Sequence, residues 1–170
     1  TIRRANAVCP LTAVQNRYSM MARHYEALFP VLEELHIGLV AFSPLANGFL
    51  SARYDKDSHF DRNTDYRSAM PQFSPLGIDQ NRELLSLLKD TAARWNATPA
   101  QISLAWMVRK KPWIIPIPGT RKPERLEENA GAAKIPLTAK EIAALDRALD
   151  SIPMSEVYGG ARCEERKKGA

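Results

Sequence analysis

Short apolar runs and longer amphipathic segments alternate along this chain. Residues 11–15, 38–42 and 113–117 are predicted as buried strands, and the continuous run at 38–42 is typical of a strand covered on both faces. The segments around them repeat apolar side chains at helical spacing. Strands that alternate with such helices predict a parallel α/β sheet with covering helices. We expect helices over residues 1–8, 25–35, 84–95, 98–111, 121–132 and 139–152.

Two helix-start signals and one long polar segment divide the chain further. Thr98–Gln101 and Thr138–Glu141 carry the Thr-x-x-Gln/Glu capping pattern, and Pro99 suits a first helical position. Residues 51–79 are rich in Ser, Asp, Arg and Pro and predict a long loop. Loops of this length inside a compact domain are usually functional. Because residues 1–8 read as the middle and end of a helix, we expect the chain to be a truncated part of a longer protein.

Composition limits the class of protein. The 170 residues are 45% hydrophobic and 25% charged, as in a globular domain, and no apolar stretch is long enough for a membrane span. The net charge of +5 is scattered over helices, so we expect no nucleic-acid partner. Cys9 and Cys163 are far apart, which favours reduced thiols and a cytoplasmic protein. His24, His36 and His59 have no metal-ligand spacing, and we expect no metal site.

The residues that follow each predicted strand are the first candidates for a site, because parallel α/β folds bind ligands at the carboxyl ends of their strands. They read QNRYS (15–19), FSPLANG (42–48) and PGTRK (118–122). In the third, Thr120 is predicted to cap a helix that carries Arg121, Lys122 and Arg125. Helix N-terminal N–H groups and guanidinium groups bind phosphate, so this segment predicts a site for a phosphate-bearing small molecule.

Three motifs give the chain a family resemblance. AVQNRYS, VAFSPLANGFL and IPIPGTRKPERLEEN, in this order, resemble the sixth, seventh and eighth strand ends of aldo-keto reductases, which are (β/α)₈ barrels. The likeness runs from residue 1 to about residue 160. A barrel of this type needs about 250 residues. The resemblance therefore implies the C-terminal half of a barrel over residues 1–160, with three parallel strands, an incomplete closure and a polar tail at 161–170.

The resemblance also implies a cofactor site across the mouth of the barrel. Gln15 matches the residue that hydrogen-bonds the nicotinamide carboxamide, and Phe42 matches the aromatic residue that stacks on the nicotinamide ring. Ser43, Leu45 and Asn47 match the turn that approaches the pyrophosphate, as a turn rich in exposed N–H groups can do.

The segment Gly119–Asn129 resembles the segment of the family that binds the adenosine end of the cofactor. Arg121 and Arg125 match the groups that hold the 2′-phosphate, with Gly119 and Thr120 leading into them, so the resemblance favours NADPH over NADH. Glu128 and Asn129 match the pair that contacts adenine.

The catalytic Asp, Tyr, Lys and His of the family lie in the first half of the barrel, so we assign no catalytic residue to this chain. We expect the parent protein to be an NADPH-dependent reductase of small-molecule aldehydes or ketones. The alternative is a noncatalytic nucleotide-binding or regulatory module of the same fold, and a third interpretation is a complete, unrelated doubly wound domain. Open sheet edges also predict self-association or a partner chain.

Overall fold

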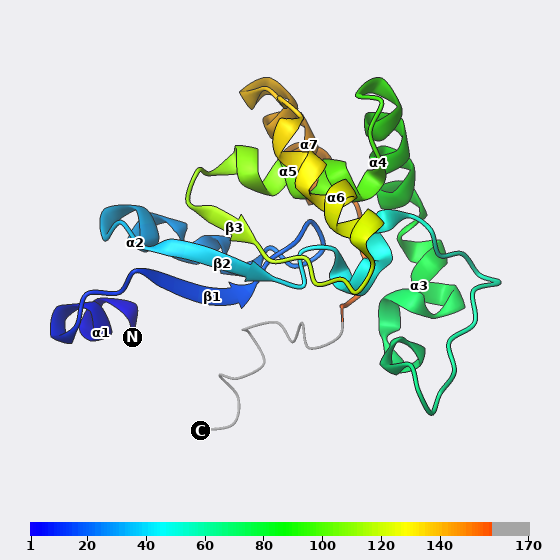
Figure 1. Cartoon of the computed structure of the whole chain (residues 1–170), viewed down its shortest axis with the longest axis horizontal. Coiled ribbons are helices and arrows are strands. Elements are labelled where there is room, and N and C mark those ends of the chain that lie inside the picture. The colour runs from blue at the N-terminus through cyan, green and yellow to red at the C-terminus, as the bar shows by residue number, and fades with distance from the viewer. Residues whose placement is uncertain (158–170) are drawn as a thin grey trace.

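Three parallel strands form the sheet at the centre of the molecule. The computed structural model describes residues 1–157 and orders the strands β1 (Ala13–Arg17), β2 (Gly38–Phe42) and β3 (Ile114–Pro116). Figure 1 shows β2 between the other two strands, with α5 beyond β3. The parallel sheet predicted from the three apolar runs is confirmed, and both β1 and β3 lie at open edges.

The strand register divides the sheet into a packed face and an open face. Leu39 pairs with Ile114, and both side chains are buried with Ala41 in the core. Val40 lies between Gln15 and Ile115 in the register and belongs to the opposite face. Ile115 is 55% exposed, which is high for an apolar strand residue. The open face is therefore the side on which a closed barrel would place its interior.

The described residues form seven α-helices, where the sequence predicted six, and two of them have the expected capping boxes. The side chains of Thr98 and Thr138 accept hydrogen bonds from the N–H groups of Gln101 and Glu141, so both sequence signals are confirmed. The helices are α1 (Ile2–Val8), α2 (Phe29–Glu34), α3 (Pro75–Gln80), α4 (Arg82–Arg94), α5 (Pro99–Lys110), α6 (Pro123–Gly131) and α7 (Ala139–Ser151).

Two predicted boundaries were wrong. The segment 51–79, predicted as one loop, contains short 3₁₀ turns at Tyr66–Ala69 and Pro71–Phe73 and the first part of α3. The helix expected from residue 121 begins at Pro123, because a residue before proline is held extended and Lys122 has φ −111° and ψ 121°. Thr120 therefore does not cap this helix. The expected tail at 161–170 and Cys163 lie outside the described residues.

A buried polar network ties the helices together behind the sheet. The hydroxyl of Tyr18 donates to Glu26 at 2.6 Å, and Lys110 contacts both Glu26 at 2.9 Å and Asp146 at 2.8 Å. Burial raises the pKa of Tyr18 far above its ordinary value. Burial also acts to raise the pKa of Glu26, but hydrogen bonds from Arg23, Tyr18 and Lys110 outweigh it and lower that pKa from 4.5. Glu26 is thus held as a carboxylate at neutral pH.

Candidate functional site

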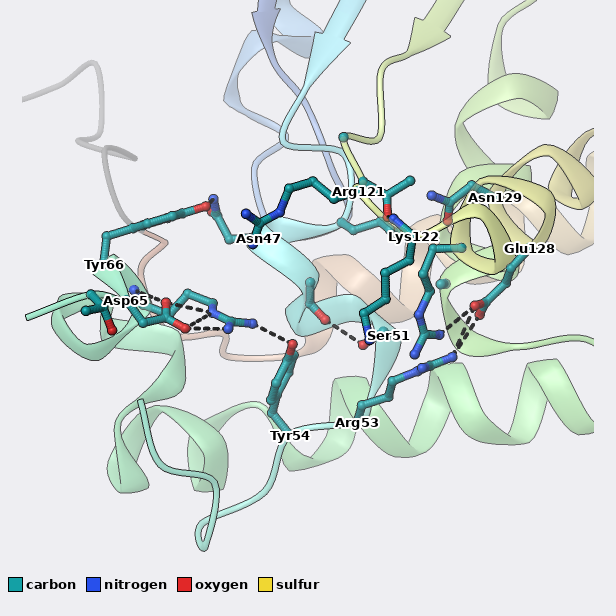
Figure 2. Close-up of a pocket in the computed structure, with 18 residues that line it drawn as sticks. Asn47, Ser51, Arg53, Tyr54, Asp65, Tyr66, Arg121, Lys122, Glu128 and Asn129 are labelled. Carbon is teal, nitrogen blue, oxygen red and sulfur yellow. Dashed lines mark hydrogen bonds and ion pairs between the residues drawn. The ribbon is translucent and has the colours of Figure 1, made fainter. Parts of the chain in front are cut away.

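A cavity of about 610 Å³ opens beyond the carboxyl ends of β2 and β3. Its walls come from the turn after β2, the segment between β3 and α6, the first turns of α6 and the segment 51–67 (Figure 2). These parts are far apart in the sequence. The cavity brings together eight of the residues named from the sequence: Leu45, Asn47, Gly119, Thr120, Arg121, Arg125, Glu128 and Asn129.

The turn after β2 has an unusual backbone. Ser43, Ala46 and Asn47 have φ values of 51°, 47° and 61°, in the left-handed region that residues with a Cβ rarely adopt. Gly48 follows with φ 95°, where the absence of a Cβ avoids the steric cost. Such residues persist only where neighbouring structure holds them, and they gather at binding sites. The turn exposes backbone groups along one wall of the cavity.

A basic wall faces this turn. Arg121 and Lys122 line the cavity just before α6, and Arg125 follows in its first turn. The N–H of Lys122 donates to the hydroxyl of Thr120 at 3.1 Å, so Thr120 closes a local turn instead of capping the helix. Guanidinium and ammonium groups around N–H-rich backbone form an environment for phosphate.

Glu128 organises two of the basic side chains. Its carboxylate accepts a hydrogen bond from Arg125 at 2.7 Å and another from Arg53 at 3.1 Å (Figure 2). The Glu128 side chain is 13% exposed, whereas that of Arg53 is 43% exposed. The carboxylate therefore sits in the wall and holds both guanidinium groups at its surface, where they remain accessible to a ligand.

The segment 51–67 supplies a wall that sequence reasoning missed. It contributes Arg53, Tyr54, Asp65, Tyr66 and Arg67 to the cavity. Arg67 forms an ion pair with Asp65, which lowers the pKa of that carboxyl group, and donates to the hydroxyl of Tyr54 at 2.5 Å. The only signal in the sequence was the length of the segment, because no spacing pattern links these residues.

The cavity does not contain all the residues named from the sequence. Gln15 lines a separate groove of about 760 Å³ beside the β1 edge, which is bounded by α1 and by Tyr25, Leu28 and Val31. Phe42 lies on the open face of the sheet with the guanidinium of Arg17 at 5.4 Å from its ring centroid. Ser43 belongs to the left-handed turn but not to the cavity lining.

Within residues 1–157, no group of three or more His, Cys, Asp or Glu side chains is placed to hold a metal ion. In the same part of the chain, no helix combines the length and the apolar character needed to cross a membrane.

Sequence comparisons match the chain to one protein family. It matches the model of the aldo/keto reductase family over residues 1–150. It is 39% identical over 162 residues to aldo-keto reductase str7 of Strobilurus tenacellus, covering 93% of this chain and 47% of the relative. It is 35% identical to probable aldo-keto reductase 1 of Glycine max, covering 94% and 45%. The chain thus spans just under half the length of these curated relatives.

Solved structures agree with the fold. A glycerol dehydrogenase from Gluconobacter oxydans superposes with a TM-score of 0.76 at 21% identity, covering 91% of this chain and 47% of that one. An aldo-keto reductase from Klebsiella pneumoniae, solved in complex with NADPH, matches at 26% identity with a TM-score of 0.55, covering 87% and 41%. The three-stranded open sheet is the C-terminal portion of a (β/α)₈ barrel. The chain belongs to the aldo/keto reductase family.

Proposed function

We propose that this chain binds NADPH and that the protein of which it is part reduces aldehydes or ketones with that cofactor. The observation that carries the proposal is the cavity in which Arg53, Arg121, Lys122 and Arg125 share the lining with a left-handed turn, whose Asn47 N–H has no backbone acceptor among the described residues. Phosphate groups of a dinucleotide match this combination of charge and backbone donors. The NADPH in the Klebsiella pneumoniae relative supports the same choice of ligand.

The basic wall is the proposed site of the adenosine 2′-phosphate. Arg125 lies in the first turn of α6, where the helix dipole also favours an anion. Arg121 precedes the helix on the same side of the cavity, and Arg53 approaches from the segment 51–67. Each guanidinium presents a planar fork of donors that suits a phosphate monoester. A cofactor without the 2′-phosphate loses these interactions, so the wall favours NADPH over NADH.

The remaining parts of the cofactor are assigned along the cavity. The pyrophosphate is proposed to lie against the turn from Ser43 through Leu45 to Asn47. Gly119 and Thr120 form the opposite side, and the adenine ring is assigned to the wall that ends in Glu128 and Asn129.

The nicotinamide end is assigned to the open face of the sheet. Phe42 offers a ring for stacking, and Gln15 offers an amide with both a donor and an acceptor for the carboxamide. When bound, the cofactor supplies the hydride for carbonyl reduction. The residues of this chain bind and orient it, and we propose no proton donor among them.

A noncatalytic nucleotide-binding module is the second candidate. It is favoured by the contacts of three tyrosines. Tyr18 is buried with a raised pKa, and the hydroxyls of Tyr54 and Tyr66 in the cavity lining accept hydrogen bonds from Arg67 and Asn47. None of the three has a partner that would make it a general acid toward a carbonyl. Assaying carbonyl reduction by the protein that contains this chain separates the two candidates, because both bind the cofactor.

Isothermal titration of the chain with NADPH and with NADH tests the cofactor assignment. We expect NADPH to bind at least about tenfold more tightly, since one charge-assisted hydrogen bond contributes roughly 1.5 kcal/mol or more. The preference should shrink as salt is raised, because the wall is partly exposed. Equal affinities for the two cofactors, or no binding of either, contradict the proposal.

A further inference from the structure

Gln72 is a fully buried polar residue with no place in the lining of the cavity. It lies in the 3₁₀ turn Pro71–Phe73 and is 0% exposed. Its Nε2 donates to the backbone carbonyl of Ala46 at 3.5 Å, while its Oε1 is buried without a partner among the described residues. A buried polar atom without a partner carries a desolvation cost. Packing alone therefore does not explain a glutamine at this position.

The surroundings of Gln72 fix it beneath the left-handed turn. The ring of Phe73 packs edge-on against Phe49, which follows that turn, with the centroids 5.5 Å apart. On the other side, α3 approaches so closely that a Cβ on Gly77 would collide with the carbonyl of Pro71. Figure 1 shows α3 and the neighbouring turns to the right of the carboxyl end of β2. Gln72 is thus packed between α3 and the residues of the left-handed turn.

The trans geometry of the Ala46–Asn47 peptide links the position of Gln72 to the cavity. The Ala46–Asn47 peptide is trans, so its C=O and N–H groups point in opposite directions. Because the carbonyl is directed to Gln72, the N–H of Asn47 points away from Gln72, and Asn47 is one of the residues that line the cavity. Within residues 1–157, no protein acceptor receives this N–H. A hydrogen bond to the carbonyl also polarises the peptide and strengthens its N–H as a donor.

We propose that Gln72 is a positioning residue, which orients the Ala46–Asn47 peptide so that the Asn47 N–H binds the cofactor pyrophosphate. The inference rests on the proposed NADPH site and adds a residue that does not touch the ligand. Ala46 and Asn47 are both left-handed, a conformation that needs outside support. The flanking amides of Ala46 and Gly48 are held by bonds within the turn, so the Gln72 donor is the contact that fixes the tilt of this peptide, and without it the N–H leaves its binding orientation.

The variant Gln72→Met tests the proposal because it keeps the length and volume of the side chain but removes the donor. Two ligands are titrated: NADPH, and adenosine 2′-monophosphate, which has the 2′-phosphate but no pyrophosphate. We expect Gln72→Met to weaken NADPH by about tenfold, the effect of one hydrogen bond to a charged group, and to leave adenosine 2′-monophosphate unchanged. A general loss of stability does not produce this separation.

Hydrogen exchange gives a second readout that needs no ligand. The amides of Gly48 and Leu50 both donate to the carbonyl of Leu45, at 2.9 and 3.1 Å, and report the order of the turn. They should exchange faster in Gln72→Met than in the control Leu88→Ala, which opens a cavity in the core on α4 away from the turn.

The outcomes separate the two proposals. Loss of NADPH affinity alone, with faster exchange in the turn, supports the role of Gln72. Equal weakening of both ligands, or unchanged NADPH affinity in Gln72→Met, overturns that role while leaving the cofactor site standing. Failure of the wild-type chain to bind either ligand overturns the proposed function, and the inference with it.

Discussion

Replacing Arg125 by Ala tests the proposed 2′-phosphate site at its most defined side chain. Arg125 lies in the first turn of α6 and is held by Glu128 at 2.7 Å. The substitution removes one guanidinium, and the Glu128 carboxylate keeps an ionic partner because Arg53 also pairs with it. We expect weaker binding of NADPH and little change for NADH.

The magnitude follows from two opposing contributions. Hydrogen bonds between a guanidinium and a phosphate contribute about 1.5–3 kcal/mol. Arg125 gives up part of its ion pair with Glu128 on binding, and a partly exposed pair of this kind contributes at most about 1 kcal/mol. The net loss in Arg125→Ala is then about 0.5–3 kcal/mol, or roughly twofold to somewhat more than a hundredfold in the dissociation constant of NADPH.

The assay is isothermal titration of both cofactors into wild type, Arg125→Ala and a matched control. Lys140→Ala is the control because it removes the same charge from an exposed position on α7, outside the cavity. Lys140→Ala should change both affinities by less than about twofold, through long-range charge alone. If Arg125→Ala weakens NADH as much as NADPH, the side chain does not read the 2′-phosphate and the reasoning fails.

Three further predictions concern stability, association and activity. Glu26→Gln should lower the free energy of unfolding in urea by about 2 kcal/mol at pH 7. Because the folded pKa of Glu26 is lowered, the difference in stability between wild type and variant should shrink as pH falls below 4.5. A stability difference that does not change with pH contradicts the network. The chain should self-associate through its open sheet, as measured by sedimentation velocity, and Ile115→Lys should weaken this association. A wild-type chain that stays monomeric at high concentration contradicts the prediction. The isolated chain should show no NADPH-dependent aldehyde reduction, and turnover abolished by changing one of its own tyrosines refutes our assignment of no catalytic residue.

The strands and most of the helices could be predicted from the sequence, because the residues that determine them are close together in the chain. A continuous apolar run such as Gly38–Phe42 specifies a buried strand, and Thr98 and Thr138 specify helix starts through bonds made three residues away. The start of α6 was misplaced because the capping potential of Thr120 was weighed above the restriction that Pro123 imposes on Lys122. Both effects are local, and the proline has the larger one.

The walls of the cavity were only partly predictable. The basic residues after β3 form one continuous motif, so the family resemblance named Arg121 and Arg125 together. Arg53 reaches the same cavity through an ion pair with Glu128, 75 positions away in the sequence. Nothing in the composition of a polar segment indicates such a pairing, because long-range contacts depend on how the segment folds back. The support of the turn by Gln72 is hidden from the sequence for the same reason.

The central claim is that the cavity between the turn after β2 and the start of α6 binds a 2′-phosphorylated dinucleotide. The most direct test is to map the backbone amide NMR shifts of the ¹⁵N-labelled chain during titration with NADPH and, separately, with NADH. With NADPH we predict changes in residues 45–53 and 119–129, and with NADH we predict that those near Arg121 and Arg125 are lost or need far more ligand. NADPH shifts that leave these two segments unchanged, or identical maps for the two cofactors, contradict the account.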